Sequence, residues 1–139
     1  MLKLPKPIIF ETGSDKINLE ESKESLNHVK EYLTAKKYIT VMRIEVHAQR
    51  AEDEKKLQTL TEKRALAVAN WLVENGIYCQ RILPVGFGST KPAFDESSPE
   101  ASQNNRVEFQ NAELAKHPIG GMPLDGGGKA VEEFCKEIK

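Results

Sequence analysis

Residues 43–72 read RIEVHAQRAEDEKKLQTLTEKRALAVANWL, and the period of their apolar side chains changes once along this stretch. Over residues 40–47, apolar and polar side chains alternate, with Ile44 and Val46 on one face. This is the period of a strand that packs one face on a core. Over residues 52–74 the apolar spacing changes to three and four, as in an amphipathic helix. The stretch therefore predicts a strand, a short turn and a long helix.

One apolar stripe of this predicted helix contains an arginine. The stripe consists of Leu57, Leu60, Arg64, Val68 and Leu72. A guanidinium on such a face can extend to solvent along its own stem, pair with a carboxylate, or point into a pocket. In a pocket, its two parallel N–H groups can hold the carboxylate of a ligand. The pattern favours the first two arrangements and leaves the third open.

The rest of the chain supplies one further helix and three further strands. The apolar runs predict strands at Ile8–Phe10, Ile82–Phe87 and Asn104–Phe109, and a helix at Asn18–Lys36 with Asn18 as its cap. With the strand at Thr40–His47, the order strand, helix, strand, helix requires a crossover, and crossovers place helices on a sheet face. The sequence therefore predicts an α+β fold, with two helices on one face of a mixed four-stranded sheet.

The domain organisation follows from where these signals stop. We expect residues 1–110 to form one domain and residues 111–139 to form a Gly-rich linker and a short amphipathic tail, Lys129–Lys139. The tail would dock on its own domain or a partner, self-associate, or stay disordered. Within the third strand, Pro84 requires an edge position or a bulge, because proline cannot donate to a ladder.

Motifs along residues 8–110 resemble the peptidoglycan-binding C-terminal domain family of outer-membrane protein A (OmpA), which is similar to the domains of Pal lipoproteins and MotB. The family has the motifs F-D/E-x-x-S, G-H-T-D, N-x-x-L-S-x-x-R-A, G-x-G-x-x-x-P and N-R-R-V-E. The matching residues are Phe10, Glu11 and Ser14, then His47, then Leu60, Arg64 and Ala65, then Gly86, Gly88 and Pro92, then Asn104, Arg106, Val107 and Glu108. The resemblance implies a βαβαββ two-layer sandwich.

The resemblance also implies a ligand, the diaminopimelate of the peptidoglycan stem peptide, which the family clasps between the Asp of T-D and the Arg of R-A. This chain keeps the arginine as Arg64 but has Gln49 in place of the aspartate, Glu52 in place of a glycine and Leu57 in place of the asparagine. The candidate ligand-binding residues are Arg64, Gln49, Arg106 and Glu11, with Glu45 or Glu11 as a substitute carboxylate. Helix-forming residues in the rebuilt loop predict that the second helix begins by Asp53, with no positive φ from Ala48 to Glu54.

Two functions follow from this comparison of motifs. The first is a non-catalytic wall-binding domain that anchors an envelope protein in the periplasm, weakened by the loss of the aspartate. The second is a domain that keeps the fold, has lost the wall ligand and serves as a protein interaction or structural module. The three departures in one loop favour the second, and the retained Arg64 favours the first.

Composition excludes several other functions. Twenty Lys and Arg against 21 Asp and Glu give a net charge of −1 without a basic block, which argues against nucleic acid. Apolar runs of four or five residues are too short for a membrane span, and the N-terminus lacks the apolar segment of a signal peptide. The three histidines, His28, His47 and His117, lie in no catalytic motif, so we expect no enzyme.

The two cysteines, Cys79 and Cys135, have no metal-ligand spacing, so the sequence predicts neither a metal nor a cofactor. Free thiols are the favoured state for two cysteines so far apart in the chain. A bridge between them stays open, because an oxidising compartment would permit it.

Overall fold

Two helices and a mixed sheet make up the part of the chain that the computed structural model describes, residues 2, 4–11, 13–49, 53–90, 105–114, 117–118 and 129–130. The elements are α1 (Leu19–Ala35), β1 (Ile39–His47), α2 (Glu54–Glu74), the 3₁₀ turn η1 (Cys79–Arg81), β2 (Ile82–Gly88), β3 (Arg106–Leu114), β4 (His117–Pro118) and β5 (Lys129–Ala130). The strand order is β4-β3-β1-β2-β5, in which β4 and β5 have only two residues each.

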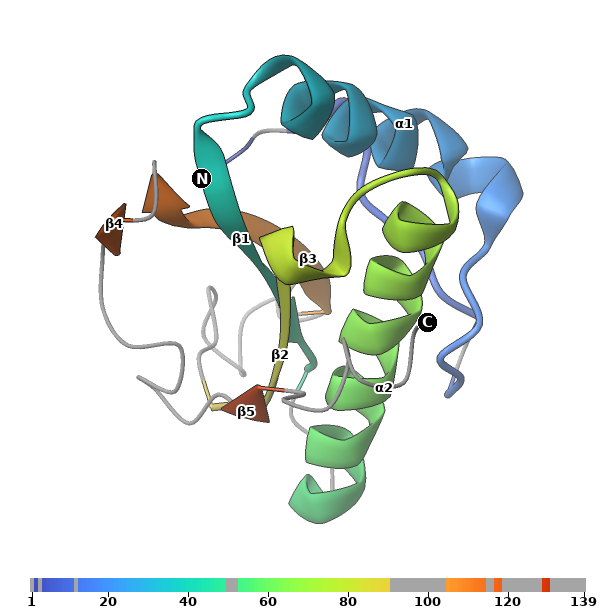
Figure 1. Cartoon of the computed structure of the whole chain (residues 1–139). Coiled ribbons are helices and arrows are strands. Elements are labelled where there is room, and N and C mark those ends of the chain that lie inside the picture. Colours follow the sequence, from blue (N-terminus) through green and yellow to red (C-terminus); the bar gives the residue numbers. More distant parts are fainter. Residues whose placement is uncertain are drawn as a thin grey trace.

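Strand β1 lies at the centre of this sheet. It runs parallel to β2, with Ile44 opposite Pro84, and antiparallel to β3, with Ile44 opposite Phe109. Figure 1 shows both helices on the same side of the sheet. The predicted α+β class, with two helices on one face of a mixed sheet, is confirmed.

The core fills the space between the helices and the sheet, and the predicted periods explain why. The fully buried core side chains come from both layers and include Leu26, Val29 and Leu33 of α1, Val68 and Leu72 of α2, and Ile44, Val46 and Phe109 of the sheet. Asn18 caps α1 by accepting the N–H of Glu21 on its side-chain oxygen at 3.2 Å, as predicted.

The prediction of a strand at Ile8–Phe10 is wrong, and with it the count of four strands. Only Phe10 forms a bridge, an isolated one with Ile17. The reason lies at the start of α1: the N–H of Ile9 donates to Ser22 Oγ at 2.8 Å, and the carbonyl of Ile9 accepts the N–H of Asn18 at 2.8 Å. Because these groups satisfy the main chain of Ile9, the segment buries Ile8 without joining the sheet.

The face of the sheet turned away from the helices is also buried, which the alternating pattern of β1 did not predict. On this face Glu45 is 5% exposed and His47 is 2% exposed. Phe87 of β2 lies beside them, and its ring stacks on the His47 imidazole with centroids 4.7 Å apart and planes at 12°. Polar side chains on this face are therefore held in low-dielectric surroundings.

Several boundaries differ from the predicted ones by a few residues. Helix α2 begins at Glu54, one residue later than expected, with Asp53 as its cap accepting the N–H of Lys56 at 3.1 Å. The prediction that no residue from Ala48 to Glu54 has a positive φ stays a prediction, because Arg50 to Glu52 lie outside the described residues. Among the described residues, β5 pairs with Val85 and Gly86 of β2, and the predicted edge or bulge at Pro84 stays a prediction.

The C-terminal part of the chain contributes to the sheet where it is described. Strand β3 runs past residue 110 to Leu114, and Lys129–Ala130 pairs with β2 as a strand, so the start of the expected amphipathic tail is extended. Residues 131–139 lie outside the described residues, and the domain boundary at residue 110 stays a prediction.

Cys79 is disulfide-bonded, so the expectation of a free thiol is wrong for this residue, and Cys135 lies outside the described residues.

None of the described helices is long and apolar enough to cross a membrane.

Arg81 is a structural residue that the sequence pattern did not single out. Its guanidinium donates to the carbonyls of Leu33 at 2.9 Å, Lys36 at 3.3 Å and Ile39 at 2.9 Å, around the C-terminus of α1. The last carbonyls of a helix have no partner within the helix. A cation near them also interacts favourably with the negative end of the helix dipole. Arg81 therefore ties the end of α1 to the start of β2.

We expect Arg81→Ala to lower the free energy of unfolding by about 2–3 kcal/mol, because several hydrogen bonds from a charged group are lost at once. Arg81→Lys should recover only part of this, since an ammonium has no second nitrogen to replace Nε, which also donates to the carbonyl of Ile39 at 3.2 Å. Urea denaturation measures both. The exposed Lys36 is the control, and Lys36→Ala should stay within about 0.5 kcal/mol of the wild type. An Arg81→Ala variant as stable as that control would contradict the assignment.

Candidate functional site

A pocket of about 370 Å³ lies at the carboxyl end of β1. It is bounded by the segment from Ile8 to Gly13, the first turns of α2 and the start of β3. Its polar lining residues are His47, Arg64, Asn105 and Arg106, and its apolar lining includes Phe10, Leu57 and Leu60. No carboxylate residue is among the described residues that line it. The pocket is therefore cationic and suited to an anionic group.

Arg64 reaches this pocket from the apolar stripe of α2. Its Nε donates to the carbonyl of Ser14 at 2.8 Å and its Nη2 donates to the carbonyl of Glu11 at 3.4 Å. The guanidinium also lies over the Phe10 ring, 4.9 Å from its centroid. Burial lowers the pKa of Arg64 and Asp15 raises it in part, but an arginine in a protein keeps its charge. Arg64 thus lines a pocket, which is the third of the arrangements that the sequence left open. It also donates to main-chain carbonyls, which the sequence pattern did not suggest.

The other predicted site residues are only partly brought together. Arg106 lines the pocket, and its Nε lies 3.3 Å from Glu108 Oε2. Gln49 does not line it, and its main-chain N–H donates to Asn105 Oδ1 at 2.7 Å. The exposed carboxylate of Glu11 pairs with Lys16 at 3.8 Å, so Glu11 approaches Arg64 through its carbonyl alone. Asn105, which the sequence analysis did not choose, joins the start of β3 to the chain after β1.

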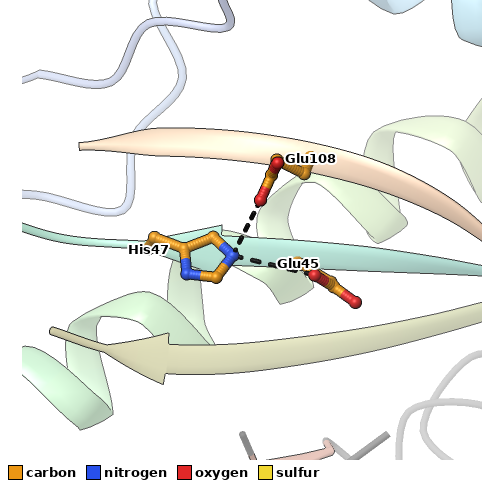
Figure 2. A group of neighbouring side chains, drawn as sticks. All are labelled: Glu45, His47 and Glu108. Carbon is orange, nitrogen blue, oxygen red and sulfur yellow. Dashed lines mark ion pairs between the residues drawn. The ribbon is translucent and has the colours of Figure 1, made fainter. Parts of the chain in front are cut away.

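A second polar group, Glu45, His47 and Glu108, lies on the sheet face turned away from the helices. Figure 2 shows the imidazole of His47 with its Nε2 directed at both carboxylates, one on the same strand and one on β3. His47 Nε2 lies 3.3 Å from Glu108 Oε2 and 3.7 Å from Glu45 Oε1. Neither ring nitrogen of His47 has a hydrogen-bond partner among the described residues. The three side chains therefore approach one another closely without a short hydrogen bond to the imidazole.

Two arginines flank this group. Arg43 Nε approaches Glu45 Oε2 at 2.8 Å, and Arg106 Nε approaches Glu108 Oε2 at 3.3 Å. The pKa of Glu108 lies below its ordinary value because its interaction with His47, and secondarily that with Arg106, favours the carboxylate more than burial disfavours it. The alternation of β1 placed Glu45 and His47 on one face, but the approach of Glu108 depends on the β1–β3 register, in which it lies opposite Glu45.

The OmpA family model matches residues 9–106 of this chain, well over half of its length. A curated relative, photosystem I P700 chlorophyll a apoprotein A2 of Gloeobacter violaceus, is 28% identical over 113 residues, a match that covers 80% of this chain. The chain spans only 12% of that relative's length.

Several solved structures share the fold. An outer membrane protein of Borrelia burgdorferi B31 is 28% identical with a TM-score of 0.59, and the match covers 76% of this chain and 84% of that one. The C-terminal domain of Helicobacter pylori MotB is 23% identical with a TM-score of 0.64, covering 75% and 81%. The peptidoglycan-associated lipoprotein of Burkholderia pseudomallei is 19% identical with a TM-score of 0.62, covering 78% and 87%. Because the family model spans most of the chain and its fold recurs in these structures, the chain belongs to the OmpA family.

Proposed function

We propose that this chain is a non-catalytic wall-binding domain of the cell envelope, and that its pocket receives a carboxylate of the peptidoglycan stem peptide. The observation that carries the proposal is the position of Arg64, whose guanidinium reaches the pocket with its charge intact. Membership of the OmpA family and the similarity to a peptidoglycan-associated lipoprotein support the same ligand and a periplasmic location.

The charges of the pocket bear on which part of the ligand is held. Diaminopimelate presents a carboxylate and an ammonium, and the described lining offers Arg64 and Arg106 but no carboxylate for the ammonium. A neutral acceptor in place of a charged one costs about 1–3 kcal/mol, or about 5- to 150-fold in affinity. We therefore propose that the domain binds diaminopimelate-containing wall more weakly than a relative with the aspartate.

The alternative is a protein interaction or structural module. Two observations favour it: Gln49 does not line the pocket, and Leu57 presents an apolar side chain where the family has an asparagine. Such a module would keep the fold and leave the pocket for another partner. Binding to purified peptidoglycan sacculi separates the two functions.

In this experiment, wild-type protein is incubated with sacculi, with and without free diaminopimelate as a competitor, and the bound fraction is measured. We expect saturable binding that the competitor reduces. Arg64→Ala should weaken binding by about 30-fold or more, because it removes the charged partner of a partly buried carboxylate. Arg64→Lys should lose most of the binding, since an ammonium cannot make two parallel bonds. The matched control is Lys63→Ala, which removes the same charge from the neighbouring exposed position of α2.

Arg64 also holds the carbonyls of Glu11 and Ser14, so circular dichroism and thermal melting must show that each variant is folded. Gln49→Asp tests whether a carboxylate at this position supplies the counter-charge that the ligand's ammonium lacks. It should strengthen binding by providing a carboxylate for the ligand's ammonium, unless it turns to pair with Arg64. If the wild type ignores sacculi and Gln49→Asp does not restore binding, wall binding is wrong and the interaction module takes its place.

A further inference from the structure

We propose that Glu45, His47 and Glu108 form a binding site for a divalent transition-metal ion of the zinc class. The site lies on the sheet face turned away from the helices and draws its ligands from the adjacent strands β1 and β3 (Figure 2). Bound there, the ion would join these two strands through their side chains as well as through the ladder.

The distances between the side-chain atoms match a shared cation better than direct contacts. Charge-assisted N–H···O bonds are about 2.7–2.9 Å long, whereas His47 Nε2 lies 3.3 Å from one carboxylate oxygen and 3.7 Å from the other. Ligand atoms bound about 2.0–2.2 Å from one ion are roughly 3–4 Å from each other. One donor atom from each of the three residues lies within 4.8 Å of the others, so a small rotation of a carboxylate brings all three to bonding distance.

The state of His47 is a second, independent indication. The residue is 2% exposed, and neither of its ring nitrogens has a hydrogen-bond partner among the described residues. A buried polar atom without a partner is costly and calls for an explanation such as a bound ion. The stacking of its ring on Phe87 keeps the imidazole plane in one orientation, with Nε2 directed at the carboxylates.

The donor set determines which ions fit. One imidazole nitrogen and two carboxylate oxygens suit Zn²⁺ and its transition-metal neighbours, whereas Mg²⁺ and Ca²⁺ prefer oxygen alone. The flanking arginines bear on affinity, because Arg43 and Arg106 already balance the two carboxylates. Arg43 contacts Oε2 of Glu45 and leaves Oε1 toward His47, so it can orient this ligand from outside. Because each carboxylate is already paired with an arginine, the site is weaker than one whose carboxylates have no cationic neighbour.

The test is a titration of the EDTA-stripped 139-residue chain with Zn²⁺ in competition with a chromophoric chelator. We expect one bound ion per chain, no competition from Mg²⁺, and a higher melting temperature with Zn²⁺. Co²⁺ in place of Zn²⁺ should give visible absorption bands of a low-coordinate site. Glu108→Gln and His47→Gln should each weaken Zn²⁺ binding by at least about 10-fold, since even the loss of an outer partner costs that much.

The controls use the other histidines of the chain. His28→Gln and His117→Gln should bind Zn²⁺ as the wild type does, and His28 is exposed on α1. If His47→Gln does not fold, Glu108→Gln decides, because the Glu108 side chain is 23% exposed and its loss is better tolerated. The site is refuted if the wild type takes up no stoichiometric Zn²⁺. It is also refuted if Glu108→Gln binds the ion unchanged, or if binding follows His28 or His117.

Discussion

Gly86→Ala should lower the free energy of unfolding by about 3 kcal/mol or more, because a methyl group at this position has no room. A Cβ on Gly86 would lie 2.5 Å from the main-chain nitrogen of Glu62 and 2.8 Å from its Cα. Both atoms belong to the backbone of α2, so no side-chain rotation relieves the contact. The helix would have to move away from β2, against which it packs.

Chemical denaturation with urea measures this effect, and the matched control is Gly76→Ala. Gly76 has open space around its Cα but a φ of 102°, so alanine there suffers only backbone strain of about 1–2 kcal/mol. A larger loss for Gly86→Ala than for Gly76→Ala identifies the close approach of strand and helix as the cause. Equal losses would mean that α2 adjusts to the methyl group and that the contact does not limit the fold.

Glu45→Ala should cost about 3–5 kcal/mol, the usual result of removing one member of a buried ion pair. The Glu45 carboxylate lies 2.8 Å from Arg43 Nε and 3.7 Å from His47 Nε2, and the residue is 5% exposed. Its removal takes the counter-charge from Arg43 and leaves a cavity within the sheet face. The unfolding free energy is measured in the presence of EDTA, so that no metal ion contributes.

The control for this variant is Glu11→Ala, which also removes a carboxylate from an ion pair. The Glu11 side chain is 54% exposed and lies 3.8 Å from an exposed lysine, so its loss should change stability by at most about 1 kcal/mol. If Glu45→Ala is as mild as Glu11→Ala, water reaches the far face of the sheet and the charges there are screened.

The helices and the three long strands could be predicted because their apolar periods reflect which face is buried. Asn18 and Asn75 mark the ends of α1 and α2 through local hydrogen bonds, which depend only on neighbouring residues. The segment Ile8–Phe10 has a strand composition as well. It fails as a strand because Ser22, 13 residues away from Ile9, satisfies its main chain, and no local pattern contains that information.

The candidate site could be predicted only in part, because some of its contacts join residues far apart in the sequence. Arg64 stood out because a cation interrupts an apolar stripe, but its partners are the carbonyls of Ser14 and Glu11, 50 and 53 residues earlier. Every residue has a main-chain carbonyl, so the sequence does not indicate which carbonyl an arginine contacts. Carboxylate side chains are visible in the sequence and are therefore the partners that it suggests. Glu108 joins Glu45 and His47 through a cross-strand register that composition and period do not determine.

The carbonyls that hold Arg64 also affect the entropy of binding. A long side chain that is mobile before it meets a ligand loses about 0.5–1.5 kcal/mol on being immobilised. Arg64 is already ordered by Ser14 and Glu11, so this loss occurs during folding and not during association. Because the two partners are neutral, they preorganise the guanidinium without competing for its charge. A ligand carboxylate would meet a donor that is both fixed in direction and still cationic.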